Sequence, residues 1–222
     1  WYFDMTKLSE KLRDYIQDNE HLPDNARNFS LNILKDGLKS RQVTRDNKWG
    51  IPSPFPGSED KTIYVWVEAV LGYLSATVQY FKNLGQEEKW KEYWFDKKTK
   101  SVYFIGKDNI PFHSIIWPAI LMGAGVLEPT DEGEALNLPY DVPANEFLNM
   151  ESRKVSGSRG WAVWMLDALS RYDPDALRYY LIANAPETRD ADFTWEEFVQ
   201  RNNTELVATW GNLANRVLSF AY

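Results

Sequence analysis

A glycine and an acid follow a short apolar run near the middle of the chain. The run SVYFIG, from Ser101, is typical of a buried strand. It ends at Gly106, and Asp108 lies two residues further on. In open α/β sheets, ligands bind beyond the carboxyl ends of the strands. A glycine there lets the backbone approach a ligand, and the acid can accept hydrogen bonds from ribose hydroxyls. On spacing alone, a plain strand-to-helix turn capped by Asp108 is the favoured interpretation.

A histidine and a tryptophan lie four residues apart in the segment that follows. We expect a helix from about residue 111 to 122, which places His113 and Trp117 on one face. A neutral imidazole beside an indole can line a mostly apolar pocket and still donate one hydrogen bond. Taken alone, a histidine satisfied within the core is the more common arrangement.

The run TIYVWVEAV is short and apolar, and it is rich in β-branched and aromatic residues. This run predicts a buried strand, on which Tyr64, Trp66 and Glu68 share one face. Ala69 leaves room for a ligand where the strand ends. Ordinary sheet packing is the favoured interpretation for any single aromatic residue here.

Cations, hydroxyls and glycines are concentrated in the segment RKVSGSRG, residues 153–160. Such a basic loop can wrap a polyphosphate and meet negative charge that builds up in a transition state. It is not a P-loop, because GxxxxGK[ST] is absent, and a flexible surface loop is the alternative. Arg45 and Asp46 are a further charged pair, for which a surface ion pair is the simple interpretation.

The elements that carry these residues alternate between helix and strand. One helix is predicted over residues 5–20, and a second follows the break at Pro23 and Asp24 and continues through Leu38. The strands and helices after them alternate, which favours an α/β domain with a parallel sheet. A helix capped by Asp173, with Pro174 at its first position, begins a helical region. The remainder to Tyr222 forms one long amphipathic helix or two.

The bulk composition limits the classes of function. The chain has 222 residues, a net charge of −7 and no cysteine, so it offers neither a disulfide framework nor a cysteine zinc site. The acidic balance does not indicate a general nucleic-acid binder, and no apolar run is long enough for a transmembrane helix. Both ends interrupt a predicted element, so we expect a piece of a longer protein.

Five blocks in a fixed order resemble one family. They read TRDNKWGIPSP, YVWVEAVLGYLSA, FIGKDNIPFHSIIWPAILMG, KVSGSRG and NTELVATWGNLANRVLSF, and together they resemble methionyl-tRNA synthetases, which are class I aminoacyl-tRNA synthetases. The archaeal and eukaryotic branches are closer than the common bacterial one. The resemblance covers nearly the whole chain.

The resemblance implies a role for each matching position. The methionine side-chain pocket matches Trp66, Ala69, Tyr73, His113 and Trp117; the ATP ribose site matches Gly106 and Asp108; the KMSKS loop over the triphosphate matches Lys154, Ser156 and Ser158, with Arg45 nearby; and the anticodon-reading pair matches Asn212 and Arg216. Lys154 also counts as an ATP-binding residue. ATP accompanied by Mg²⁺, methionine and methionine tRNA are the implied substrates, without a membrane partner or a metal site in this chain.

The chain also departs from the family pattern. The HIGH motif and the zinc knuckle belong to the family's first half, so zinc is expected only in a part that precedes Trp1. Gly157 stands where the second lysine of KMSKS is usual, Glu68 where Asp is usual and Val70 where Pro is frequent. A lysine at position 157 would neutralise charge on the leaving pyrophosphate.

We therefore expect ATP-dependent attachment of methionine to its tRNA in the cytoplasm, by a longer enzyme of which this piece is inactive alone. Residues 1–165 are predicted to be the second half of the Rossmann-type catalytic domain, 166–200 a stem-contact-like linker, and 201–222 the first helix of an all-α anticodon domain. The oligomeric state stays open. The alternatives are an impaired, synthetase-like paralogue that only binds tRNA or methionine, and an unrelated α/β nucleotide-binding enzyme.

Overall fold

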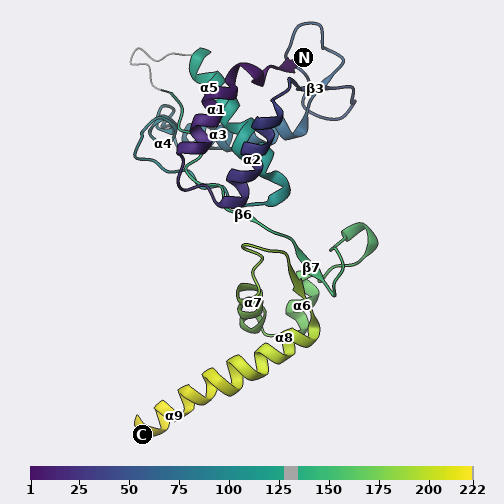
Figure 1. Ribbon diagram of the computed structural model, residues 1–222, viewed down its shortest axis with the longest axis vertical. Coiled ribbons are helices and arrows are strands. Elements are labelled where there is room, and N and C mark those ends of the chain that lie inside the picture. The colour runs from purple at the N-terminus through teal and green to yellow at the C-terminus, as the bar shows by residue number, and fades with distance from the viewer. Residues whose placement is uncertain (128–134, 222) are drawn as a thin grey trace. The chain divides into compact units, whose positions relative to one another are not determined.

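The structure, a computed structural model, describes residues 1–127 and 135–221. Contacts divide the chain into two compact units, Trp1–Ala144 (unit 1) and Asn145–Tyr222 (unit 2). Figure 1 shows helices as the main elements of both units, with short paired strands between them.

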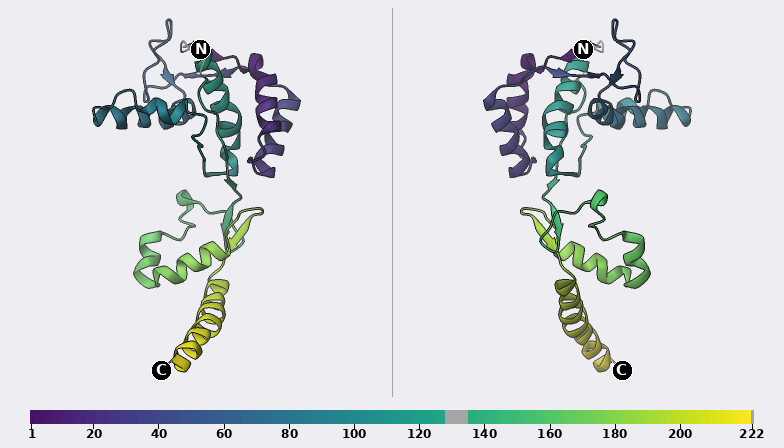
Figure 2. Two further views of the ribbon diagram at one scale, coloured as in Figure 1. Left: turned by 90° about the vertical axis from the view of Figure 1, so that its left-hand side faces the viewer. Right: turned by 90° about the vertical axis from the view of Figure 1, so that its right-hand side faces the viewer.

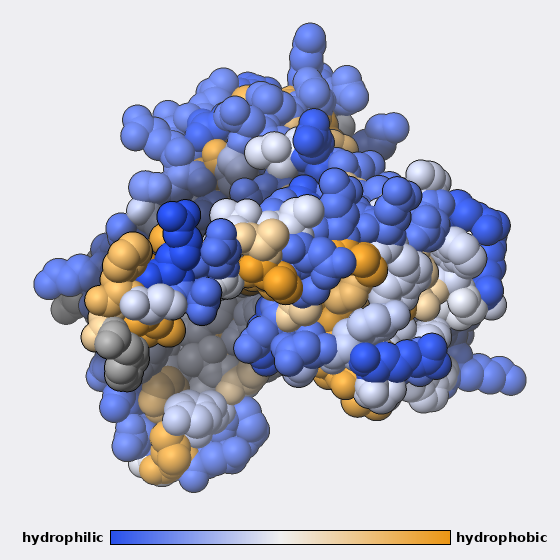
Figure 3. All heavy atoms as spheres, turned by 90° about the horizontal axis from the view of Figure 1, so that it is seen from below, coloured by the Kyte–Doolittle hydropathy of each residue, from blue (hydrophilic) through white to orange (hydrophobic). Residues whose placement is uncertain are grey.

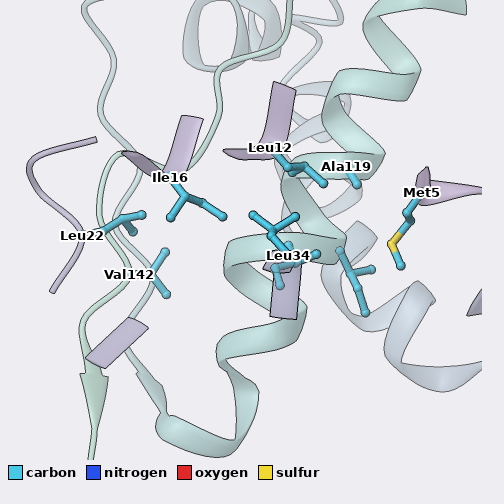
Figure 4. Packing of buried hydrophobic residues seen from close by; sticks show 9 residues of the cluster. Met5, Leu12, Ile16, Leu22, Leu34, Ala119 and Val142 are labelled. Atoms are coloured by element: carbon cyan, nitrogen blue, oxygen red, sulfur yellow. The ribbon is translucent and has the colours of Figure 1, made fainter. Parts of the chain in front are cut away.

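Two helices open unit 1 as the sequence predicts. After the turn η1 (Met5–Leu8), α1 (Ser9–Asp18) buries Leu12 and Ile16 completely. Helix α2 (Asp24–Asp36) follows Pro23 and ends at Gly37, whose φ of 87° lies in the region that favours glycine. Apolar side chains of η1, α1 and α2 meet those of η3 (Phe112–Ile116), of α5 (Trp117–Leu127) and of the segment before β6 (Ala144–Asn145) in one core cluster. Figure 4 draws its members: Met5, Leu12, Ile16, Leu22, Leu34, Ile115, Ile116, Ala119 and Val142.

A second layer of unit 1 lies on the other side of a central helix. This helix consists of the wide π-helical turn η3 (Phe112–Ile116) and α5 (Trp117–Leu127), and it confirms the helix predicted from about Pro111. Its residues Trp117 and Leu121 pack on Val70 of α3 (Val65–Asn83), with α4 (Trp90–Trp94) beside them. The η3–α5 helix is therefore covered by α1 and α2 on one face and by α3 on another (Figure 2).

The strands of unit 1 are short. Pairs form between β1 (Tyr2–Phe3) and β2 (Arg41–Gln42), between β3 (Thr44–Arg45) and β4 (Thr62–Ile63), and between β5 (Ile105–Gly106) and β6 (Ala144–Asn145). The first two pairs are antiparallel. Before β5, Val102 forms a parallel bridge with Asp141, and the N–H groups of Tyr103 and Ile105 donate to the carbonyls of Asp141 and Pro143, both at 3.0 Å.

The prediction of a buried strand over TIYVWVEAV was wrong. Only Thr62 and Ile63 are in a strand, and the helix α3 begins at Val65. A continuous apolar run shows neither a two-residue nor a 3.6-residue period, so packing partners decide its structure. Tyr64, Trp66 and Glu68 thus do not share a strand face.

The prediction of a buried strand over SVYFIG was correct only in part, because Ile105 and Gly106 are in a strand, Val102 forms an isolated bridge, and burial alternates. Tyr103 is buried, with 8% of its surface exposed, whereas Phe104 is 80% exposed. This alternation is typical of a strand covered on one side.

Unit 2 contains a parallel strand pair bridged by helices. Strand β7 (Leu148–Met150) pairs in parallel with β8 (Ala191–Phe193), and the chain between them includes η4 (Gly157–Arg159), α6 (Met165–Arg171) and α7 (Pro174–Ala183). The predicted cap of α7 is confirmed, since the Asp173 carboxylate accepts from the N–H of Asp175 at 2.8 Å. Five buried residues form the core of this unit: Ala168, Leu177, Tyr180, Phe193 and Phe198.

The chain ends in one long helix rather than two. Helix α8 (Trp195–Arg201) is capped by Thr194, and it continues without a break through the π-helical η5 (Asn202–Gly211) into α9 (Asn212–Ala221). The α/β class with a helical C-terminal part is therefore confirmed. No helix in the described residues is both long and apolar enough to cross a membrane.

Candidate functional site

Three of the predicted pocket residues share one face of α3. Trp66, Ala69 and Tyr73 are spaced at i, i+3 and i+7, which is one stripe of a helix. Trp66 stacks on Phe112 of η3, with ring centroids 4.6 Å apart. The helix thus brings these residues together, although the strand expected for Trp66 and Ala69 is absent. On the same helix, Glu68 Oε2 is buried and has no hydrogen-bond partner in the described part of the chain.

His113 connects this face of α3 to η3. Its Nδ1 lies 3.0 Å from the carbonyl oxygen of Asn109, and its Nε2 lies 2.8 Å from the Tyr73 hydroxyl. Because a carbonyl only accepts, Nδ1 carries the proton, and Tyr73 donates to Nε2. Burial lowers the pKa of His113 below its ordinary value of 6.5, and the Asn109 bond opposes this only partly. The imidazole is therefore neutral at pH 7, and the proton we expected it to offer to a ligand is held by Asn109.

Trp117 lies deepest in this aromatic group. It is fully buried, its ring centroid is 6.3 Å from that of Tyr73, and its indole N–H donates to the Tyr103 hydroxyl at 3.1 Å. Sequence reasoning missed Tyr103. The available signal was its inward position between the outward-facing Val102 and Phe104. Below, the aromatic cluster means Trp66, Tyr73, Tyr103, Phe112, His113 and Trp117.

Gly106 ends β5, and Asp108 follows it two residues later, as expected. Asp108 lies in the turn η2 (Lys107–Asn109), where its carboxylate is folded back toward Gly106. A Cβ on residue 106 would lie 3.0 Å from Asp108 Oδ1, so the absence of a side chain makes this close approach possible. Asp108 is exposed, and the next residue, Asn109, provides the carbonyl that accepts from His113. The turn therefore joins the strand end to the aromatic cluster.

Arg45 is held at the start of α3. Its guanidinium lies 4.0 Å from the ring centroid of Tyr64 and donates to the carbonyls of Gln42 and Thr44. The simple surface ion pair with Asp46 is not formed, because Asp46 pairs with Lys61. Within residues 1–127 and 135–221, the cation is thus placed by an aromatic ring and by backbone oxygens, and no carboxylate pairs with it.

The basic loop in unit 2 is built on a tight turn. Glu151 and Ser152 have φ values of 48° and 59°, and the Asp192 carboxylate accepts from the Ser152 N–H at 2.7 Å and from its hydroxyl at 3.1 Å. Non-glycine residues rarely adopt this conformation unless the surroundings enforce it. The turn therefore anchors the start of the loop to β8.

Within the loop, two cations lie over aromatic rings. Arg153 is 4.5 Å from the Trp161 ring centroid, and Lys154 is 5.2 Å from that of Phe147. Ser156 and Trp161 exchange backbone hydrogen bonds of 2.8 and 2.9 Å, and the Ser156 and Ser158 hydroxyls are 3.3 Å apart. Lys154, Ser156 and Ser158 are thus brought into one short loop.

The C-terminal helix exposes the predicted anticodon pair. Asn212 and Arg216 lie one turn apart on α9, and both are exposed. The neighbouring apolar stripe is also exposed: Leu213 at 55%, Val217 at 58% and Phe220 at 89%. Figure 3 shows such hydrophobic residues on the surface among hydrophilic ones.

The predicted residues fall into two groups. Unit 1 holds the aromatic cluster, Gly106, Asp108 and Arg45, and unit 2 holds the loop and the α9 pair. In residues 1–127 and 135–221, no three His, Asp or Glu side chains gather as a metal site would require.

Comparisons with known proteins identify a family for this chain. The family model described as "tRNA synthetases class I (M)" matches residues 1–218. The chain is 54% identical over 220 residues to a methionine–tRNA ligase of Thermomicrobium roseum, and 54% identical over 218 residues to that of Thermofilum pendens. These matches cover 99% and 98% of the chain but only 36% and 37% of the relatives, so the chain spans just over a third of their length.

The likeness extends to solved structures. The crystal structure of Mycobacterium tuberculosis methionyl-tRNA synthetase bound by methionyl-adenylate superposes with a TM-score of 0.77 at 27% identity. It covers 98% of this chain and 40% of that one.

Proposed function

Because the chain belongs to the family of class I tRNA synthetases (M), we propose that it is part of an enzyme that uses ATP to join methionine to its tRNA. The observation that carries this proposal is the aromatic cluster, in which a neutral His113 makes a hydrogen bond through each of its ring nitrogens. Uncharged aromatic surfaces suit a polarizable thioether, whereas a charged side chain would be poorly solvated there.

The proposed reaction has two steps. A carboxylate oxygen of methionine attacks the α-phosphorus of ATP, the bond to the β-phosphate breaks, and pyrophosphate leaves. A terminal ribose hydroxyl of the tRNA then attacks the carbonyl of methionyl-adenylate, and AMP leaves. Both steps depend on positioning and charge stabilisation, so a nucleophilic side chain is not required.

In this proposal, residues outside the aromatic cluster bind ATP. Gly106 lets the ribose approach the backbone at the end of β5, and the Asp108 carboxylate accepts hydrogen bonds from the ribose hydroxyls. Lys154, Ser156 and Ser158 contact the triphosphate, and Arg45 adds positive charge near the reacting groups. Mg²⁺ enters with ATP as part of that substrate.

We retain the division into a catalytic part (1–165), a linker part (166–200) and the start of an anticodon domain (201–222) as a proposal. Asn212 and Arg216 then read the anticodon of methionine tRNA, since an amide and a guanidinium can both bond the edges of unstacked bases. A cytoplasmic location and a zinc knuckle outside these residues stay predictions.

The test is pyrophosphate exchange by the whole protein that contains this chain, alongside equilibrium binding of methionine. We expect methionine-dependent exchange between ATP and pyrophosphate, and binding of methionine in the micromolar to millimolar range that is usual for substrates, about 1 μM to 1 mM. A folded protein that neither binds methionine nor exchanges pyrophosphate would contradict the proposal.

One observation favours a second candidate, a paralogue that binds methionine or tRNA without activating the amino acid. Gly157 brings no charge to the loop at a place where the family usually has lysine. Methionine binding without any exchange would support this candidate over the enzyme.

A further inference from the structure

Within the aromatic cluster, Tyr103 contacts three other members. Its hydroxyl accepts the hydrogen bond from the Trp117 indole at 3.1 Å, and its ring meets Tyr73 edge-on at 4.9 Å. The His113 ring is 5.9 Å away. Only 8% of Tyr103 is exposed, so it is not a surface on which a ligand could rest. Burial raises the pKa of Tyr103, which keeps the hydroxyl neutral.

The hydrogen bond selects one orientation of the indole. Trp117 is fully buried, and Trp94 packs edge-on against it at 5.8 Å. Apolar packing alone allows more than one rotation of the indole about its Cβ–Cγ bond, because such torsions have broad energy wells. A buried N–H without a partner is costly, so the orientation that reaches Tyr103 is strongly preferred. The edge that Trp117 presents to Tyr73 is thereby determined.

We propose that Tyr103 is a positioning residue that fixes the indole of Trp117 and, through it and Tyr73, the shape that selects methionine. This inference rests on the proposed function of the aromatic cluster. Tyr103 acts through its neighbours and does not itself contact the substrate. It therefore affects how well methionine is held and distinguished more than how fast the bound substrates react.

The test uses Tyr103→Phe in the whole protein, because this change keeps the ring and removes only the hydroxyl that accepts from Trp117. In pyrophosphate exchange, we expect KM for methionine to rise about tenfold while kcat changes less than about twofold. The ratio of kcat/KM for methionine over leucine should fall by a similar factor. A purely structural role would lower the active fraction, and hence kcat, with KM unchanged.

A double-mutant cycle and a control make the result specific. The Trp117→Phe protein lacks the indole N–H. Adding Tyr103→Phe to it should change KM for methionine by less than about twofold relative to Trp117→Phe alone. Tyr180→Phe is the matched control, since Tyr180 is buried in unit 2 and its hydroxyl is also hydrogen-bonded. It should leave KM for methionine unchanged. If Tyr103→Phe does not fold, Trp117→Phe alone asks the same question and should raise KM.

The outcomes separate this inference from the function on which it rests. The inference about Tyr103 is overturned, and the proposed function is not, by either of two outcomes. One is an active Tyr103→Phe protein with unchanged KM and selectivity for methionine. The other is an equal effect of Tyr103→Phe on KM in the wild type and in the Trp117→Phe protein. A wild-type protein without methionine-dependent exchange would overturn the proposed function, and the inference with it.

Discussion

At the scale of single residues, the hydrogen bonds of His113 determine what the aromatic cluster can offer. The N–H at Nδ1 is held by Asn109, and Nε2 receives the Tyr73 hydroxyl. The Tyr73 oxygen therefore presents lone pairs and no proton. The aromatic cluster itself is then uncharged, which matches a thioether better than an amine or a carboxylate.

The lowered pKa of His113 has a consequence for stability. Below the ordinary value of 6.5, the unfolded chain takes up a proton at His113 that the folded chain resists. Stability conferred by the neutral ring is therefore present above that pH and is lost as the pH falls toward the folded value. We expect the thermal midpoint of the wild type to fall from pH 7 to 5 by more than that of His113→Gln.

The control for this measurement is His21→Gln, because His21 is the other histidine and is exposed. It should retain the wild-type pH dependence. Equal pH dependence in His113→Gln and the wild type would contradict the neutral, buried state of His113.

Gly157 makes a second prediction at the scale of single residues. An added Cβ would meet only the Trp164 ring at 3.7 Å, and the backbone is not left-handed there, so lysine can be accommodated. Gly157→Lys in the whole protein should speed pyrophosphate exchange or leave it unchanged. One charge contact in a water-excluded site is worth about 2–4 kcal/mol.

Arg159 decides between these two results. Arg153 and Lys154 lie over aromatic rings, whereas Arg159 is exposed in the same turn as Gly157. If Arg159 already supplies the missing charge, Arg159→Ala should slow exchange and Gly157→Lys should restore it. A large loss of exchange in Gly157→Lys alone would show that the loop requires a glycine, against the charge explanation.

At the scale of elements, the helix α3 shows where sequence reasoning succeeded and failed. The cap of α7 and the end of α2 near Gly37 could be predicted, because each has a local signal, whereas the last segment could be predicted only as one long helix or two. The run TIYVWVEAV has no such signal, and burial of Val70 against Trp117 and Leu121 supports a helix there. Tyr103 was missed for a related reason, since its partner Trp117 is fourteen residues away along the chain.

The register of α3 leads to a prediction about Ala69. This residue is exposed between Trp66 and Tyr73 on the same stripe. Ala69→Leu keeps helix propensity and adds volume where we place the methionine side chain. Overpacking typically costs about 1–3 kcal/mol, so KM for methionine in exchange should rise by about tenfold or more while thermal stability is retained.

Ala76→Leu is the matched control, two turns and about 10 Å further along the same stripe. It should leave KM unchanged. If Ala69→Leu also leaves KM unchanged, the stripe of Trp66, Ala69 and Tyr73 does not face methionine.

At the scale of the whole molecule, the order of the five sequence blocks was the most informative feature. Each block alone had a plain structural interpretation, and only their succession indicated the family, which the match over residues 1–218 confirms. The roles of the individual site residues are harder to predict from the sequence than the family is. They are proposed from the resemblance, and the matching methionine–tRNA ligases are nearly three times as long as this chain.

Recognition of tRNA is predicted to depend on α9. Arg216→Ala in the whole protein should reduce charging of methionine tRNA and leave pyrophosphate exchange intact, because the side chain is exposed in unit 2 and the aromatic cluster is in unit 1. Losing a base contact of this kind costs about 1–3 kcal/mol, or roughly 5- to 150-fold in charging efficiency. The matched control is Ser219→Ala on the same exposed helix. Unchanged charging by a folded Arg216→Ala protein would defeat the anticodon role.

The most direct test of the central claim is the amino-acid dependence of pyrophosphate exchange by the whole protein. Methionine, leucine, isoleucine and lysine are compared at saturating ATP, and kcat/KM is measured for each. An uncharged aromatic cluster that holds a thioether predicts that methionine is preferred over the two aliphatic side chains, by about 10- to 200-fold or more, and that lysine is not activated. Preference for another amino acid, or no exchange with methionine by a folded protein that binds ATP, would contradict it.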